Sequence, residues 1–70
     1  MEKRPDLERL GKRIKELRLS KDLTQFELAA RLGKDHSSIA RMEAGRINPS
    51  YLYLLELSRG LEIDIKAFFD

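Results

Sequence analysis

The stretch that decides the fold runs from Thr24 to Pro49 and reads TQFELAARLGKDHSSIARMEAGRINP. Thr24 and Glu27 have the spacing of a capping box, in which each side chain bonds the backbone amide of the other, so a helix begins here. Gly33 ends this helix, because glycine adopts the left-handed turn that commonly follows a helix. Asp35 is placed to cap a second helix. The stretch therefore predicts two short helices joined by a tight turn.

The second of these helices is expected over residues 36–44 and stops at Gly45. Ile39 and Met42 face the core, whereas the leading edge of this helix is polar. Two helices, a glycine turn and a polar leading edge together make a helix-turn-helix over residues 24–44. The second helix of such a unit can lie in the major groove of DNA.

A first helix precedes this unit. Its apolar residues recur at helical spacing and are Leu7, Leu10, Ile14 and Leu17. Asp6 is placed to cap this helix, and Lys21-Asp22 closes it. Residues 1–5 read as a short charged arm, which we expect to be mobile.

Two more helices are expected after the helix-turn-helix. Ser50 follows a turn and can cap a helix from Tyr51 to about Arg59, and Asp64 can cap a last short helix over residues 65–69. No segment alternates with a two-residue period for long enough to be a strand. The expected fold class is therefore all-α, with five helices in a single domain over residues 1–70.

The composition narrows the classes of protein further. The chain has 70 residues, no cysteine and one histidine, so neither a disulfide, a thiolate metal site nor a His-rich metal site is expected. No apolar run approaches the roughly 20 residues of a membrane span. We expect a soluble cytoplasmic protein without metal or cofactor, with no membrane partner and no small-molecule ligand.

The charge is distributed unevenly. Residues 1–50 hold 12 Lys+Arg and 8 Asp+Glu, whereas residues 51–70 hold 2 and 4. The basic part contains the helix-turn-helix, and basic surface attracts phosphate through the release of condensed counterions. An excess this modest also fits an ordinary solvated surface.

The whole pattern resembles the Cro/repressor-type helix-turn-helix family, the XRE-like or lambda-repressor-like DNA-binding domains, from Leu10 to Phe69. The residues that carry the resemblance are Leu23-Thr24-Gln25, Glu27-Leu28-Ala29, Leu32-Gly33, Ser37, Ile39, Arg41, Glu43, Gly45, Asn48-Pro49-Ser50 and Leu54-Leu55. The Gly60-Leu61-Glu62-Ile63 step and the Phe68-Phe69 ending also look like the small dimeric controllers of restriction–modification operons. The resemblance implies a compact five-helix domain that binds double-stranded DNA.

The resemblance also implies which side chains reach base edges, namely His36, Ser37 and Arg41. Ser37 and Arg41 lie one helical turn apart, so both face the groove when Ile39 faces inward. Arg41 can bond guanine O6 and N7 with two donors. The alternatives are a surface histidine without a role and an arginine that faces solvent or phosphate.

Contacts to the DNA backbone are implied for Thr24, Gln25, Lys34, Ser38, Arg46 and Asn48. Gln25 opens its helix, and its amide together with the helix N-terminus makes an anion site. The alternatives are a glutamine chosen for helix propensity and ordinary loop polarity at the flanking residues. Asp35 departs from the family's usual Ser or Thr and places a negative charge beside the DNA.

Arg18 and Glu43 occupy positions at which the family commonly joins its first helix to the end of its third by an ion pair. Glu43 is therefore expected to be structural and not a catalytic carboxylate.

The C-terminal part, residues 51–70, carries more apolar surface than a small core can hide. Leu61, Ile63 and Phe68 are expected in the core. Leu52, Ile65 and Phe69 are expected to form a two-fold homodimer contact, which would place two recognition helices on a palindromic operator.

The leading hypothesis is thus a sequence-specific DNA-binding transcriptional regulator that acts as a homodimer, with repression and activation both open. An antitoxin-like module, whose C-terminal apolar surface grips a partner protein, is the alternative. An enzyme is poorly supported, because the side chains of His36 and Ser37 point apart on a helix and no metal-ligand cluster or phosphate-binding glycine loop is present.

Overall fold

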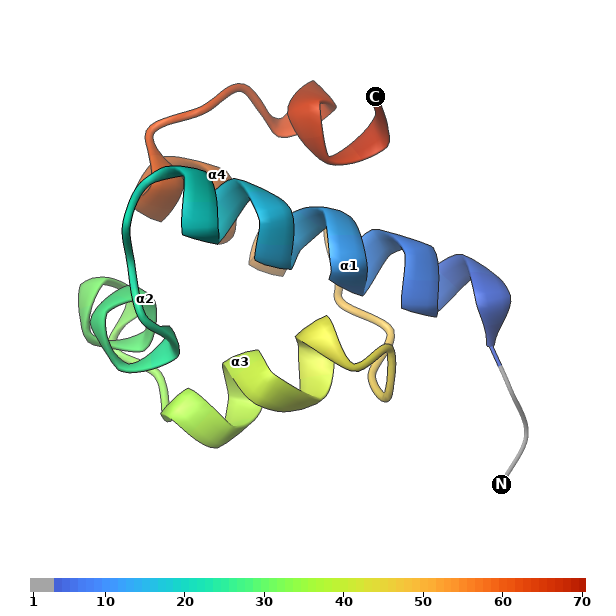
Figure 1. Cartoon of the computed structure of the whole chain (residues 1–70), viewed down its shortest axis with the longest axis horizontal. Coiled ribbons are helices and arrows are strands. Elements are labelled where there is room, and N and C mark those ends of the chain that lie inside the picture. The colour runs from blue at the N-terminus through green and yellow to red at the C-terminus, as the bar shows by residue number, and fades with distance from the viewer. Residues whose placement is uncertain (1–3) are drawn as a thin grey trace.

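Four α-helices and a short 3-10 helix make up the part of the chain that the computed structural model describes, residues 4–70 (Figure 1). The elements are α1 (Pro5–Ser20), α2 (Gln25–Leu32), α3 (His36–Glu43), α4 (Tyr51–Leu61) and η1 (Ile65–Phe69). The all-α class is confirmed. The count of five α-helices is wrong, because Ile65–Phe69 wind more tightly as a 3-10 helix, with Ala67 N–H donating to Asp64 O at 3.0 Å.

The start of α1 differs from the expectation. Pro5 is the first helical residue and Arg4 holds the N-cap position, so Asp6 is not the cap. Proline favours the first helical position because its fixed φ suits a helix and its missing N–H costs nothing there. Asp6 lies in the first turn and accepts a hydrogen bond from Arg9 at 3.3 Å. The arm predicted over residues 1–5 is therefore shorter than expected, because Pro5 belongs to α1. Residues 1–3 of this arm lie outside the described residues.

The turn between α2 and α3 forms as predicted. Thr24 and Glu27 make both bonds of the capping box, and Gly33 follows α2 in the left-handed conformation with φ 66°. Asp35 holds the N-cap position of α3, but its side chain makes no cap hydrogen bond, which corrects the expected cap contact. The helix expected over 36–44 ends one residue earlier, at Glu43.

The fourth helix is longer than expected. Ser50 caps α4 by accepting from Tyr53 N–H at 3.1 Å. The helix then continues through Gly60 to Leu61, which is fully buried. Burial of Leu61 outweighs the poor helix propensity of glycine, which is about 1 kcal/mol.

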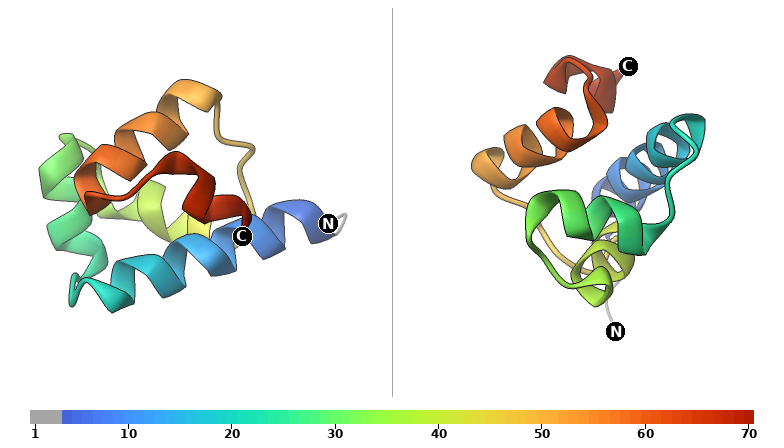
Figure 2. Two further views of the ribbon diagram at one scale, coloured as in Figure 1. Left: turned by 90° about the horizontal axis from the view of Figure 1, so that it is seen from above. Right: turned by 90° about the vertical axis from the view of Figure 1, so that its left-hand side faces the viewer.

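The core lies between the helices and draws on all four of them and on η1. Its residues are Ile14, Leu23, Leu28, Ala29, Ile39, Met42, Leu54, Leu57, Leu61 and Phe68. The helix α3 packs on α1 and α2, α4 packs on α2, and η1 packs on α1 and α4. Figure 1 shows α1 running across the molecule with α3 below it and η1 above it, and the right-hand view of Figure 2 shows α2 and α3 together on one side. This packing leaves the outer surfaces of α2 and α3 uncovered.

Among residues 4–70, no helix combines the length and the apolar character that crossing a membrane requires.

Candidate DNA interface

The N-terminus of α2 has the chemistry of an anion site. The Oγ1 of Thr24 accepts from Glu27 N–H at 3.0 Å, and Glu27 Oε1 accepts from Thr24 N–H at 2.8 Å. The second bond, from the Thr24 backbone amide, is the main reason why the pKa of Glu27 lies below its ordinary value of 4.5. The first turn of a helix offers no internal acceptor to the amides of Gln25 and Phe26. A phosphate oxygen placed here would receive donors from both amides.

The side chain of Gln25 is held from behind by a buried ion pair. Its Nε2 donates to Glu43 Oε1 at 3.0 Å. Arg18 bonds the same carboxylate twice, Nε to Oε2 at 2.7 Å and Nη2 to Oε1 at 3.1 Å, and its Nη1 donates to Leu23 O at 2.7 Å. The side chains of the pair are 6% and 3% exposed. In the described part of the chain, no buried side-chain nitrogen or oxygen lacks a partner. The expected ion pair is thus present, and it also sets the position of Gln25.

The helix α3, which is the expected recognition helix, turns its polar residues outward. Ile39 and Met42 are buried at 0% and 1% exposure, whereas His36, Ser37 and Arg41 are all exposed. The three residues therefore share the outer side of α3, where their donors are open to a base edge.

Two of the residues expected at the DNA backbone are engaged with α4. Ser38 Oγ lies 2.9 Å from the hydroxyl of Tyr53. Lys34 Nζ lies 3.2 Å from Glu56 Oε2 and 4.7 Å from the centre of the Tyr53 ring. A phosphate contact by either side chain requires it to share or exchange these partners. Tyr53 and Glu56 were not expected at the site, because a helical pattern does not show which residues of another helix face it.

Arg46 and Asn48 lie in the loop between α3 and α4, and both are exposed. The backbone N–H of Arg46 donates to Arg41 O at 3.0 Å, so the loop begins tied to the end of the recognition helix. Their side chains are available at the rim of α3.

Phe26 contacts one of the expected site residues, and sequence reasoning did not single it out. Its ring stacks on His36 with the ring centres 4.0 Å apart and the planes at 21°, and the residue is 67% exposed. A sequence signal for it existed. Phe26 lies two positions before Leu28 and so on the opposite side of the helix from it, although Ala29, three positions on, lies nearer its side.

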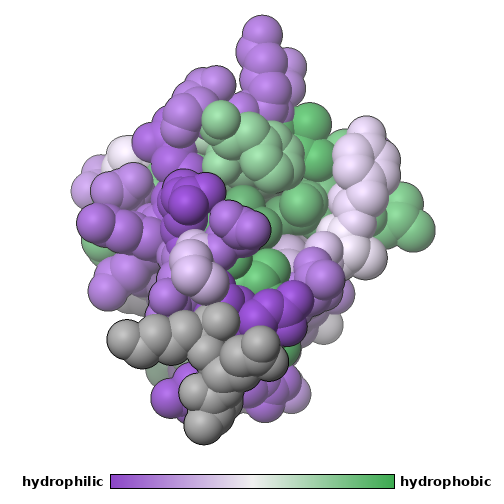
Figure 3. Space-filling view, turned by 90° about the vertical axis from the view of Figure 1, so that its right-hand side faces the viewer, coloured by the Kyte–Doolittle hydropathy of each residue, from purple (hydrophilic) through white to green (hydrophobic). Residues whose placement is uncertain are grey.

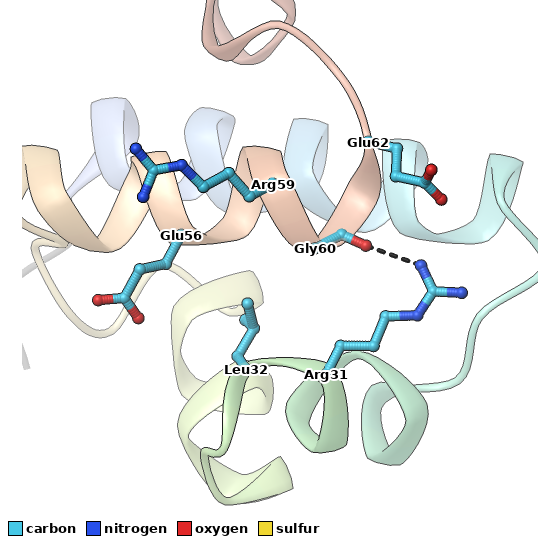
Figure 4. Close-up of a pocket in the computed structure, with 6 residues that line it drawn as sticks. All are labelled: Arg31, Leu32, Glu56, Arg59, Gly60 and Glu62. Carbon is cyan, nitrogen blue, oxygen red and sulfur yellow. Dashed lines mark hydrogen bonds between the residues drawn. The ribbon is translucent and has the colours of Figure 1, made fainter.

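A shallow pocket of about 450 Å³ lies between α2 and α4. It is lined by Arg31, Leu32, Glu56, Arg59, Gly60 and Glu62. Figure 4 shows Arg31 reaching across it, where its Nη1 donates to Gly60 O at 2.7 Å. This bond ties α2 to the end of α4 and so helps to fix the helix-turn-helix on the rest of the molecule.

The C-terminal apolar residues divide into three groups. Leu61 and Phe68 are buried, whereas Leu52 and Phe69 are 69% and 66% exposed. Ile65, expected on the outside with them, is half-buried against the core. Figure 3 shows apolar side chains gathered on one face, and a pocket of about 380 Å³ opens between α1 and η1. Its apolar lining comes from Leu7, Leu10, Phe68 and Phe69.

The geometry of α2, the glycine turn and α3 defines the class of protein. The model of the helix-turn-helix family matches residues 14–68, and the chain belongs to this family. The class is that of DNA-binding transcriptional regulators of the XRE-like type, and the family is not an enzyme family.

Two curated relatives bear names of the same kind. An uncharacterised HTH-type transcriptional regulator of Archaeoglobus fulgidus is 37% identical over 57 residues, which cover 81% of this chain and 80% of the relative. A second uncharacterised HTH-type transcriptional regulator, from Sinorhizobium fredii, is 37% identical over 54 residues, or 77% and 70% of the two chains.

The solved structures that resemble the chain include two restriction–modification controller proteins. The controller C.AhdI of Aeromonas hydrophila superposes with a TM-score of 0.91 at 36% identity, covering 94% of this chain and all of that one (100%). Wild-type C.Esp1396I gives a TM-score of 0.81 at 32% identity, covering 90% and 83%. The resemblance to such controllers that the sequence indicated is thus confirmed at the level of the fold.

Proposed function

We propose that this protein is a sequence-specific transcriptional regulator that binds a palindromic operator as a homodimer, with α3 in the major groove. The observation that carries the proposal is the exposure of His36, Ser37 and Arg41 on a helix whose opposite side is locked into the core. An α-helix with its side chains is about 10–12 Å across and the major groove is about 12 Å wide, so the groove can take α3.

Each group of residues has its own task in this proposal. Arg41 reads guanine through two donors, and His36 and Ser37 bond neighbouring base edges. Gln25 and the first amides of α2 bond a phosphate, which fixes the register of α3 along the groove. Thr24, Lys34, Ser38, Arg46 and Asn48 add contacts to the backbone.

The size of the site that one protomer can read supports a homodimer. The longest extent of the molecule is 31 Å, whereas successive major-groove turns on one side of DNA are about 34 Å apart. One protomer with one recognition helix therefore reads a single half-site. The exposed Leu52 and Phe69 supply apolar surface for a two-fold contact that spaces two such helices, and Ile65 is half-buried.

The candidate physiological role is control of a restriction–modification operon. Its support is the likeness to the two controller proteins, which covers 90% or more of this chain. In this role the operator lies upstream of restriction or modification genes.

Selection of bound sequences from a random pool of double-stranded oligonucleotides, at a fixed salt concentration, tests the proposal. We expect enrichment of a sequence with two inverted half-sites whose centres lie about one helical turn apart. A pool that remains random after repeated rounds would contradict sequence-specific binding, and an enriched site without symmetry would contradict the homodimer.

A further inference from the structure

The rings of Phe26 and His36 form an aromatic pair on the surface of the molecule. The two rings are nearly parallel, at 21°, with centres 4.0 Å apart. Phe26 remains 67% exposed, although a phenyl ring is among the side chains that gain most from burial. The buried residues of α2 are Leu28 and Ala29, so the ring of Phe26 contributes little to the core.

The aromatic pair lies next to both kinds of proposed DNA contact, those to the phosphate backbone and those to the bases. Phe26 directly follows Gln25, the expected phosphate contact, and His36 directly precedes Ser37, an expected base contact. The stack therefore bridges the first turn of α2 and the first residue of α3. Its rings lie between the backbone-contacting and the base-contacting parts of the interface.

A histidine at the start of a helix needs such support if it is to read a base. An exposed imidazole moves among several rotamers, and ordering it in a complex costs entropy. A hydrogen bond to a base edge also requires the ring nitrogen to lie near the plane of the base. A ring stacked on one face of the imidazole limits its orientations while it leaves the edge with the nitrogens free.

We propose that Phe26 is a positioning residue that sets the plane of the His36 imidazole for reading a base edge, and that it thereby contributes to operator specificity. This inference rests on the proposed function. In this inference Phe26 affects DNA binding only through His36. An aliphatic side chain of similar size would not replace it, because the effect needs the flat face of an aromatic ring.

Four variants separate these requirements. Phe26→Leu keeps an apolar side chain but removes the ring face, Phe26→Tyr keeps the ring, His36→Ala removes the group to be positioned, and Phe26→Leu/His36→Ala combines two of the changes. Leu19→Ala is the matched control, because Leu19 is also a large exposed apolar residue, 53% exposed, but lies in α1. Melting curves by circular dichroism check that each variant is folded before its binding is compared.

Dissociation constants are measured for the operator selected with the wild-type protein and for random DNA. We expect Phe26→Leu to weaken operator binding by about three- to tenfold, the range that aromatic pairs typically support, and to leave binding to random DNA unchanged. Phe26→Tyr and Leu19→Ala should bind like the wild type. The double variant should bind the operator as weakly as His36→Ala alone, because Phe26 has nothing left to position.

Three results would overturn the inference: wild-type affinity of Phe26→Leu for the operator, equal losses on operator and random DNA, or additive losses in the double variant. A wild-type protein that enriches no operator would refute the proposed function itself. An operator-binding wild type with an unaffected Phe26→Leu would refute only the role of Phe26.

Discussion

The carboxylate of Glu43 joins a buried ion pair to Gln25, the proposed phosphate contact. It receives two bonds from Arg18 and one from Gln25, so it joins the end of α3 to α1 and to the first residue of α2. Family resemblance was sufficient to predict the pair with Arg18. The bond from Gln25 could not be predicted, because a sequence does not specify which rotamer a partly buried side chain adopts.

Glu43→Ala tests the structural role of this carboxylate. The change leaves the buried guanidinium of Arg18 without its partner, so we expect a loss of about 3–5 kcal/mol in the free energy of unfolding and a sharply lower melting temperature. Glu16→Ala is the control, because Glu16 is half-exposed and lies 3.9 Å from Arg13. Thermal melting followed by circular dichroism measures both variants, and an unchanged curve for Glu43→Ala would remove this assignment.

Gln25→Ala and Arg41→Ala should differ in how they affect binding. Loss of a phosphate contact weakens binding to every sequence, whereas loss of a base contact relaxes the preference at one base pair by about 1–3 kcal/mol. Fluorescence anisotropy titrations against operator and random DNA separate the two effects. Equal losses on both DNAs for both variants would contradict this division of roles.

Three of the five helix starts predicted from a capping side chain form as expected, whereas Asp6 does not cap α1 and Asp35 makes no cap hydrogen bond at α3. The Thr24 capping box, the Ser50 cap and the Asp64 cap are local, and all three form as expected. The end of α4 depends instead on the burial of Leu61, and the winding of η1 depends on how five residues fit against α1 and α4. Such tertiary constraints leave no local pattern in the sequence.

The capping box makes the stability of α2 depend on pH. The pKa of Glu27 is lowered in the folded state by the Thr24 bonds, so its contribution is present above the unfolded pKa and is lost as pH falls through the lower, folded value. We expect the melting temperature to fall in this acidic range, and Glu27→Gln to make that fall smaller. Thermal melts between neutral and acidic pH measure the difference. Identical pH profiles for the two proteins would contradict the assignment.

Gly11 controls how closely α1 approaches α3. A Cβ at this position would lie 2.5 Å from the carbonyl oxygens of Met42 and Glu43, both backbone atoms that cannot move aside alone. Gly→Ala inside a helix normally stabilises by about 1 kcal/mol. Here we expect Gly11→Ala to destabilise by about 1–3 kcal/mol, because the two helices must separate.

Chemical denaturation measures the sign of this effect, with Lys12→Ala as an exposed control in the same helix. Stabilisation by Gly11→Ala would show that the close approach imposes no such constraint.

The molecule as a whole presents a recognition helix on one side and exposed apolar residues on the last two elements. The order of the helices and the core could be predicted, because helical periodicity alone separates Ile39 and Met42 from the polar residues of α3. The half-buried state of Ile65 could not be predicted from the sequence, because it depends on how η1 packs against α1 and α4.

Dimerisation is tested by Leu52→Glu, which places a charge on the proposed contact. We expect the wild-type protein to sediment as a dimer at micromolar concentration and the variant to sediment as a folded monomer with weaker operator binding. Leu19→Glu, at a similarly exposed apolar position in α1, should remain dimeric. A wild-type protein that is monomeric at high micromolar concentration would exclude the homodimer and would favour a different partner protein for Leu52 and Phe69.

Methylation interference at guanine N7 tests most directly whether α3 reads base edges in the major groove. The N7 atom of guanine lies in the major groove. Methylation of the guanine that Arg41 contacts should therefore block binding, and it should do so at the corresponding position of both half-sites. In Arg41→Ala the interference at that guanine should disappear while interference at other guanines persists. Binding that is indifferent to N7 methylation throughout the operator would contradict major-groove recognition by α3.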